Sequence, residues 1–437
     1  EAFSADAVEV GNQFAGQMAI ALHSARAARD LLLGSDDGAA PVAPEALVAA
    51  ELAGRIDAVI TGLIRSSTKL LPDDVSRVFA EETAAIGLHD ATILLADLED
   101  RVLTPLSPGH RLGVQEIDAT LAGRVFQLER PVVVNGEDGR SGIWMPLVDG
   151  AERLGVIYVE SPATSPLLLR RIEDLAGLLA ELIVSKSQYG DALKLAARSR
   201  DLTLAAELRW AIVPPLTFSG ERVGIACVLE PAYEVAGDAF DYAINDGVLH
   251  LAVMDAMGHG LEASRMANLV IAGYRMARRQ GLDLPATYRL MDEALADQFG
   301  EERFVTAQLA TLDTGNGKMQ WLNAGHPRPL LLRQGRVAFE LKCEPTLPLG
   351  LGGEPTLAEV ALEPTDSLLF FTDGIVEAAS PDGERFGTDR LLDFTRRALA
   401  DRQTLAETAR RLVRAVRAHR AGPLADDATI LFVDWHP

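Results

Sequence analysis

Residues 250–264, HLAVMDAMGHGLEAS, place one carboxylate directly after an apolar run and follow it with two glycines. The residues before Asp255 are typical of a buried strand, and Gly258 and Gly260 let the chain turn before a predicted helix. An acid in this position is either a turn residue or a metal ligand. The other acidic segments of the chain help to distinguish these two interpretations.

Three further acidic segments lie in the same half of the chain, in AGDAFDYAI (Asp238 and Asp241), LLFFTDGIVEA (Asp373) and ADDATILFV (Asp426 and Asp427). Most of these acids adjoin a strongly apolar run, and strand ends of one sheet lie close in space. Any single acid is more simply a turn residue. As a set, they favour hard divalent cations, which prefer carboxylate oxygens and can clamp a phosphoryl group in pairs.

Composition limits the classes of function. The chain has 437 residues, of which 48% are hydrophobic, and a formal net charge of -22. Such a surface repels phosphate backbones and anionic lipid, so we expect neither nucleic-acid nor membrane binding. We also expect no membrane span and no signal peptide. The first residue is Glu1 rather than Met, so we expect the chain to be a fragment of a longer protein.

Cysteine usage points to a reducing compartment. The two cysteines, Cys227 and Cys343, are far apart and lack metal-ligand spacing. This argues against a disulfide framework and a thiolate zinc site, and it favours a cytoplasmic location.

The patterns of apolar residues predict a multidomain α/β (α+β) protein. Residues 1–35 and 36–70 read as a helix, a linker and a second long helix. Residues 71–172 read as an α+β unit with a mainly antiparallel sheet, whose strands fall in ATILLADLE, RVLTPL, PVVVNGEDGRSGIWMPLV and GAERLGVIYVES. Residues 213–437 alternate strands with helical blocks at 262–280, 284–299 and 389–420, which predicts a layered α/β sandwich.

Residues 173–212 are predicted to be a helical linker, as part of one long helix over 167–212. A rough apolar seam is formed by Leu175, Leu178, Leu182, Tyr189, Leu193 and Ala196. The seam favours either a coiled coil or an amphipathic helix lying on its own domain. If the helix is continuous, its rotation or translation would couple the preceding unit to the C-terminal one.

The C-terminal motifs resemble a known family. GDAFDY, VMDAMGHGLEAS, NAGHPRPLLL, LPLGL, FFTDGIVEA and DDATILFV occur in the order seen in the PPM family of metal-dependent serine/threonine phosphatases, and they are similar to its SpoIIE-type branch. The resemblance covers about residues 213–435. It implies an αββα sandwich with two Mn²⁺ or Mg²⁺ ions.

The resemblance also implies roles for individual residues. Asp238 would bridge both metals, Asp255 would ligate one, and the backbone carbonyl of Ala256 the other. Asp373 and Asp426 would complete the site. These four acids are the expected catalytic residues, because a metal-bridging water would attack the phosphorus of a phosphoserine or phosphothreonine.

Nearby residues have weaker assignments. Asp427 is expected to support rather than to ligate, and Thr372 and Thr429 either support metal ligands or simply pack in strands. His259 does not match the family's general acid. His326, with Asn323, is expected to hold a turn. The sequence departs from the family at Ala236-Gly237 and at Ala256, where glycine is usual.

Residues 71–172 resemble a GAF domain, and residues 1–35 resemble the exit helix of a preceding, truncated one. The resemblance implies binding of a small ligand and pairing through helices, hence a homodimer. A covalently attached bilin is not expected, since the unit has no cysteine. His89 and His110 are isolated, so haem is not expected either.

These observations predict a cytoplasmic, metal-dependent protein serine/threonine phosphatase regulated by a GAF-type sensor. Family analogy suggests a bacterial regulatory protein as substrate, such as a STAS-domain anti-anti-sigma factor. Two alternatives remain open. One is a non-catalytic sensor or scaffold with a phosphatase-like fold, and the other is a GAF-controlled two-metal nucleotide enzyme.

Overall fold

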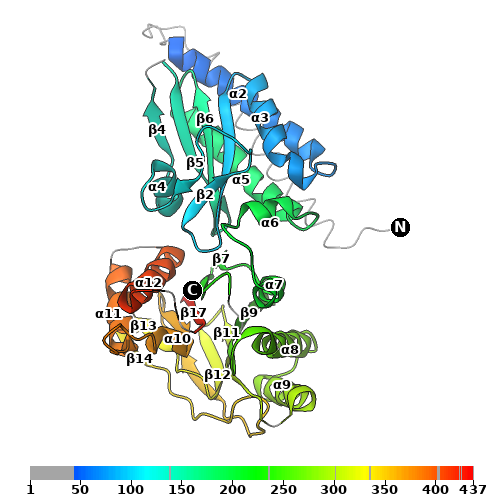
Figure 1. Ribbon diagram of the computed structural model, residues 1–437, viewed down its shortest axis with the longest axis vertical. Coiled ribbons are helices and arrows are strands. Elements are labelled where there is room, and N and C mark those ends of the chain that lie inside the picture. The colour runs from blue at the N-terminus through cyan, green and yellow to red at the C-terminus, as the bar shows by residue number, and fades with distance from the viewer. Residues whose placement is uncertain are drawn as a thin grey trace.

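The computed structural model describes residues 44–436 apart from 137–138, 235–236, 301, 334–335, 401–403, 423 and 425. The predicted helix and linker over residues 1–43 lie outside the described residues. The described chain forms two domains stacked end to end, with the N-terminal domain above the C-terminal one in Figure 1.

A six-stranded antiparallel sheet forms the N-terminal domain, in the order β3-β2-β1-β6-β5-β4. Its strands are β1 (His89–Ala96), β2 (Val102–Pro105), β3 (Gln115–Glu116), β4 (Val132–Asn135), β5 (Ser141–Asp149) and β6 (Glu152–Ser161). Its helices are α2 (Pro44–Ser66), η1 (Pro72–Asp74), α3 (Val75–Ala85), α4 (Leu121–Leu128) and α5 (Pro166–Lys186). The predicted hairpin and antiparallel sheet are therefore confirmed.

Both faces of this sheet are covered. Alternation along the strands sends Ile93 and Leu95 of β1 into a core with α2, α3 and α5. The intervening Leu94 and Ala96 face the other side and pack with α4. Two apolar faces explain why these strands read as nearly continuous apolar runs.

The prediction of one continuous helix over residues 167–212 is wrong. The structure has α5, a short α6 (Ala192–Ala196) and α7 (Leu204–Trp210), separated by non-helical segments. Gly190 lies against Pro72, where a Cβ would be 3.0 Å from the proline Cγ. The Ser199 hydroxyl donates to Asp97, and Thr203 caps α7 by accepting from Ala206 N. Tertiary contacts and capping thus override helical propensity, and the coupling hypothesis loses its continuous helix.

The C-terminal domain contains two antiparallel sheets. The five-stranded sheet has the order β15-β12-β11-β10-β9 and the six-stranded sheet the order β14-β13-β16-β17-β8-β7. The strands are β7 (Thr217–Ser219), β8 (Val223–Glu230), β9 (Asp238–Asn245), β10 (Val248–Ala256), β11 (Val305–Asp313), β12 (Lys318–Ala324), β13 (Leu330–Arg333), β14 (Arg336–Glu340), β15 (Ala358–Ala361), β16 (Ser367–Phe371) and β17 (Ala428–Trp435).

Helices cover the outer face of each sheet, as Figure 1 shows. The helices α8 (Gly260–Arg279) and α9 (Leu284–Phe299) pack on the five-stranded sheet. The helices α11 (Gly387–Ala400) and α12 (Leu405–Arg420) lie on the six-stranded side, which also carries the short α10 (Asp373–Val376). A third core fills the space between the sheets. The expected αββα sandwich is confirmed, but the single helical block predicted over 389–420 is two helices.

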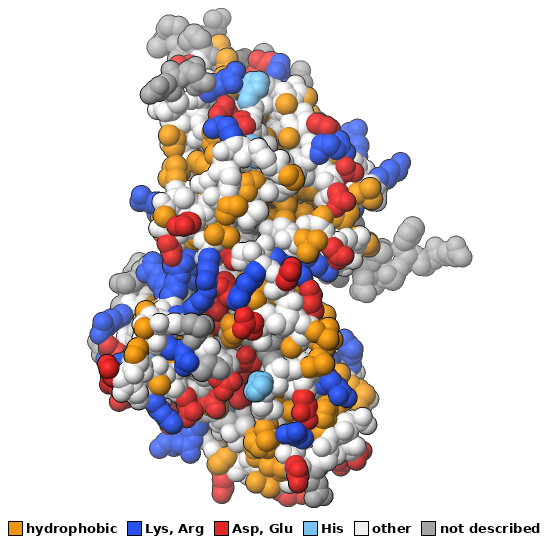
Figure 2. Space-filling model, viewed as in Figure 1, with side chains coloured by type: hydrophobic (Ala, Val, Ile, Leu, Met, Phe, Trp, Pro, Cys, Tyr) orange, Lys and Arg blue, Asp and Glu red, His pale blue; other side chains and the backbone are white. Residues whose placement is uncertain are grey.

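Ion pairs join the two domains. Arg153 of β6 donates to Glu407 of α12 at 3.1 Å, and Arg410 donates to the backbone carbonyl of Asp100 at 3.1 Å. Arg414 pairs with Asp118. The side chains of Arg153, Glu407 and Arg410 are almost fully buried. Figure 2 shows basic side chains gathered where the domains meet. Breaking such desolvated pairs one partner at a time is costly, so they fix how the domains are arranged.

None of the helices in the described part of the chain combines the length and the apolar character that crossing a bilayer requires.

The interface contains an acid that predicts a pH dependence of stability. Burial, with the neighbouring Glu99 next in importance, raises the pKa of Glu230 to about 8. The folded state therefore holds a proton that the unfolded state releases above its ordinary pKa near 4.5. This contribution to stability is complete below that ordinary pKa and is lost as pH rises through about 8.

We expect Glu230→Gln to remove this dependence, so that the variant gains stability relative to the parent as pH rises from 5 to about 9. Urea unfolding of both proteins across this pH range measures the difference. Glu344→Gln, an exposed acid, serves as the control. A difference between parent and Glu230→Gln that is constant with pH would contradict the prediction.

Candidate metal centre

Four of the predicted acids lie at neighbouring strand ends of the two sheets, near enough for charges of the other acids to act on Asp255. Asp238 begins β9 and pairs in register with Asp255, near the end of β10. Asp373 begins α10 two residues after β16, and Asp426 lies two residues before β17. Antiparallel pairing of β16 with β17 brings these last two ends to one side of the sandwich.

Asp238 is the most buried of these acids, with 1% of its surface exposed. Its Oδ2 accepts hydrogen bonds from the hydroxyls of Thr372 at 2.7 Å and Thr429 at 2.6 Å. Its Oδ1 is buried and has no hydrogen-bond partner among the described residues. Thr372 and Thr429 therefore support the carboxylate, and one buried oxygen remains available for a cation.

Gly237 creates the room for a second oxygen ligand. The backbone N–H of Ala256 donates to the Gly237 carbonyl at 3.2 Å. A Cβ on Gly237 would lie 2.8 Å from the Ala256 carbonyl oxygen and 3.4 Å from Oδ1 of Asp255. The expected ligands Asp255 and Ala256 thus both face the loop that precedes Asp238. Glycine at 237 leaves this approach open, although Ala256 replaces the family's glycine.

Asp427 has the supporting position that was expected. Its Oδ2 accepts from the backbone N–H of Gly237 at 2.6 Å and from that of Asp238 at 3.2 Å. A Cβ on Gly374 would lie 1.9 Å from the Asp427 carbonyl oxygen, so the residue after Asp373 must be glycine. Asp373 and Asp426 are themselves exposed. The six-stranded sheet therefore holds the Asp238 loop and presents two accessible acids.

Mutual repulsion among the acids is visible in their pKa values. Burial, followed by Asp373 and Asp426, raises the pKa of Asp255 to about 7. Burial, followed by Asp255, raises the pKa of Asp238 well above its ordinary value. Burial and then Asp426 raise that of Asp373. Negative charge concentrated in this way favours a cation.

A divalent cation fits this set of donors. Among the described residues, no three His, Cys, Asp or Glu side chains lie close enough together to hold a metal ion without rearrangement. The negative charges of Asp373, Asp426 and Asp427 nevertheless act on Asp255, because they raise its pKa. All the available donors are hard oxygens, including the unpartnered Asp238 Oδ1, which is the donor type that Mg²⁺ and Mn²⁺ prefer.

Arg209 is a component that the sequence interpretation missed. It lies on α7 and is fully buried. Burial lowers its pKa, whereas the charges of Asp427, Asp238 and Asp255 raise it. A positive charge from the linker therefore acts on the acidic centre. The one signal in the sequence was an arginine within the apolar stretch LRWAIV.

The remaining candidates lie outside the centre. Asp241 is buried and forms ion pairs with Arg275 and Arg278, both at 2.6 Å, so its role is structural. His326 exchanges hydrogen bonds with Asn323, which confirms the expected turn. Burial lowers the pKa of His326 to about 3, so its ring is neutral at physiological pH. His259 is exposed at the start of α8.

The hydroxyls around Asp238 predict a stability effect. We expect Thr429→Val to lower the free energy of unfolding by about 1–3 kcal/mol, because it removes a hydrogen bond to a buried carboxylate. Urea unfolding without added metal measures the loss, with the exposed Thr356→Val as control. Equal stability of the two variants would show that Thr429 does not hold Asp238.

The C-terminal domain of the chain is similar to known proteins. Residues 245–436 match the family described as Stage II sporulation protein E (SpoIIE). Protein IcfG of Synechocystis sp. is 25% identical over 198 residues, covering 39% of this chain and 31% of its own length. The phosphoserine phosphatase RsbP of Bacillus subtilis is 24% identical over 210 residues, covering 46% and 51%.

Among solved structures, the SiaA-PP2C domain of Pseudomonas aeruginosa is 24% identical with a TM-score of 0.46, covering 57% of this chain and 98% of that domain. The chain spans at most about half the length of the two curated relatives described above. The family match includes Asp255, Asp373 and Asp426, and it confirms the resemblance found in the motifs. Over residues 245–436 this chain is therefore similar to the SpoIIE family.

Proposed function

We propose that this chain is a metal-dependent protein serine/threonine phosphatase. The observation that carries the proposal is the position of Asp238, Asp255, Asp373 and Asp426 at neighbouring strand ends of the two sheets, where burial and the surrounding negative charges raise the pKa values of the first three. The similarity to RsbP, a phosphoserine phosphatase of Bacillus subtilis, supports the same reaction class.

Within this proposal, Asp238, Asp255, Asp373, Asp426 and the Ala256 carbonyl hold one or two Mn²⁺ or Mg²⁺ ions. When bound, such ions neutralise phosphoryl charge and lower the pKa of water. The residues of the chain position that chemistry: Asp238 is fixed by two threonine hydroxyls. The exposed Asp373 and Asp426 leave the centre open to a large substrate, as a phosphoprotein requires.

We propose a phosphorylated bacterial regulatory protein as the substrate, with a STAS-domain anti-anti-sigma factor as the first candidate. The support is the SpoIIE family match together with the relatives RsbP and RsbU, both phosphoserine phosphatases of Bacillus subtilis. We further propose a cytoplasmic location, because Cys227 and Cys343 are both free and buried.

The N-terminal domain is proposed to be a GAF-type sensor. A six-stranded antiparallel sheet with α2 and α5 on one face and α4 on the other supports this assignment. We also propose a homodimer formed through α2 and α5. A groove between their ends exposes Leu71 and Tyr189, at 62% and 76% of their surface. Light scattering of the protein and of Tyr189→Asp tests the dimer.

The decisive experiment is hydrolysis of p-nitrophenyl phosphate and a phosphoserine peptide with Mn²⁺. We expect Asp255→Asn and Asp373→Asn to lose about 100-fold or more in activity, because each removes a ligand from the centre. Asp297→Asn, an exposed acid on α9, is the matched control and should retain activity.

The outcomes separate the alternatives. Full activity in Asp255→Asn and Asp373→Asn would refute the proposed centre. No hydrolysis of phosphopeptides, together with turnover of a nucleotide substrate, would favour the two-metal nucleotide enzyme. A protein that binds Mn²⁺ but turns over no substrate would support the non-catalytic scaffold.

Metal titration provides an independent test. We expect calorimetry to show Mn²⁺ binding to the parent and weaker binding by at least about tenfold in Asp238→Asn, since that residue supplies the unpartnered buried oxygen. The stoichiometry shows whether the centre holds one ion or two. Unchanged affinity in Asp238→Asn would exclude it as a ligand.

A further inference from the structure

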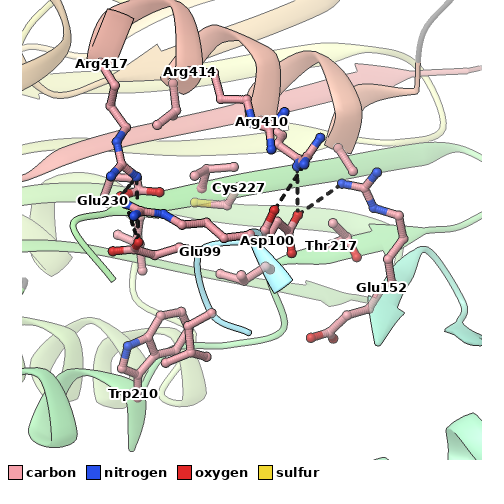
Figure 3. Close-up of a pocket in the computed structure, with 18 of the residues that line it drawn as sticks. Glu99, Asp100, Glu152, Trp210, Thr217, Cys227, Glu230, Arg410, Arg414 and Arg417 are labelled. Atoms are coloured by element: carbon pink, nitrogen blue, oxygen red, sulfur yellow. Dashed lines mark hydrogen bonds and ion pairs between the residues drawn. The ribbon is translucent and has the colours of Figure 1, made fainter. Parts of the chain in front are cut away.

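Polar side chains are buried between the two domains, where they pair with one another. A cavity of about 320 Å³ between the domains is lined by arginines and carboxylates. Figure 3 shows Arg410 beside Asp100 and Arg417 beside Glu230, and both pairs lie within ion-pair distance. These side chains therefore help to hold the domains together.

Another group of buried polar side chains lies between the two sheets of the C-terminal domain. Thr306, Gln308 and Asn323 point into this space, because they alternate with residues of β11 and β12 that pack under α8 and α9. Gln308 and Asn323 are almost fully buried. Thr306 pairs in register with Asp255, so the group lies at the end of the sandwich that carries the acidic centre.

The chain crosses from one sheet to the other beside these side chains. Residues 325–329 connect β12 of the five-stranded sheet with β13 of the six-stranded sheet. The strand β13 pairs with β16 in an antiparallel register that, extended back along the crossover, leads to Phe371, two residues before Asp373. The crossover therefore connects the surroundings of Asp255 with those of Asp373.

Hydrogen bonds from both neighbouring strands fix the backbone of this crossover. The backbone N–H of His326 donates to Oδ1 of Asn323 at 2.8 Å, and Nδ2 of Asn323 donates to the His326 carbonyl at 2.9 Å. Nε2 of Gln308 donates to the Pro327 carbonyl at 3.1 Å. The path of the chain between the sheets is thus set by side chains that face the space between them.

The side chain of His326 ties the crossover to β11. It is almost fully buried, and its Nδ1 shares a hydrogen bond of 2.8 Å with the hydroxyl of Thr306. Burial lowers the pKa of the ring to about 3, although the backbone of Phe371 raises it. The ring is therefore neutral, and it can hold Thr306 without the cost of burying a charge.

We propose that His326 is a positioning residue of the metal centre. By binding Thr306, it fixes the spacing of the two sheets beside the centre, and with it the separation of Asp255 from Asp373. The inference rests on the proposed metal-dependent phosphatase. His326 acts in it through Thr306 and touches neither metal nor substrate.

A second link between the sheets lies on the opposite side of the centre. Thr372 and Thr429 of the six-stranded side bind Asp238 of β9. The strand β10, which carries Asp255, lies between β9 and β11 in the five-stranded sheet. Polar links on both neighbouring strands therefore hold the strand that presents Asp255.

The test is calorimetric titration of the full chain with Mn²⁺. We expect Thr306→Val to weaken Mn²⁺ binding by about tenfold, because it removes the partner of the His326 ring with little change in shape. Thr306→Ser keeps a hydroxyl and should bind Mn²⁺ within about twofold of the parent. Thr311→Val makes the same substitution on β11 but on the opposite face of the sheet, so it should leave the affinity unchanged.

A double variant tests whether the two residues act as one unit. His326→Leu should weaken Mn²⁺ binding as Thr306→Val does, and combining the two substitutions should cause no further loss. Urea unfolding without metal shows whether each variant is folded. The two variants of Thr306 keep the test decisive if His326→Leu does not fold.

Three outcomes would contradict the proposal. Affinity equal to the parent's in Thr306→Val and in folded His326→Leu would overturn it and leave the pair a structural contact. Losses that add in the double variant would overturn it as well, since the two residues would then act independently. No Mn²⁺ binding to the parent would overturn the proposed centre itself, and this inference with it.

Discussion

The C-terminal domain depends on one buried carboxylate, that of Asp238, because it joins the two sheets of the sandwich. Asp238 belongs to the five-stranded sheet, and the two hydroxyls that bind its Oδ2 come from Thr372 and Thr429 of the six-stranded side. The carboxylate of Asp427 accepts hydrogen bonds from the backbone N–H groups of Gly237 and Asp238. A charge buried in this way is tolerated only when it is well hydrogen-bonded, so the layers are held in register at the point where chemistry is proposed.

The acidic centre is electrostatically unfavourable without a cation. Burial and the charges of Asp373 and Asp426 raise the pKa of Asp255, and the positive charge of Arg209 offsets only part of this effect. Strain of this kind is typical of functional sites, where stability is given up for binding.

The short helix α7 contributes side chains both to the interface between the domains and to the surroundings of the acidic centre. The helix α7 presents Trp210 to the cavity between the domains and Arg209 to the acidic centre. Arg153, Glu407 and Arg410 are buried in the same interface. The continuous helix that the sequence pattern favours is thus replaced by packed side chains and paired charges, which connect the two domains.

The sequence by itself predicted most of the strands, the helices α8 and α9 and a layered sandwich, because apolar periodicity is a local property, and its motif order singled out the acids for which metal binding is proposed. It did not reveal that the linker breaks after Lys186, since Pro72 and Asp97 contact that region from distant parts of the chain. The apolar pattern alone could not separate Asp241 from Asp238, which are three residues apart: Asp241 contacts two arginines, whereas Asp238 accepts from two threonines. Only the tertiary structure decides such differences, because the charge and burial of a side chain depend on neighbours that the chain brings together by folding.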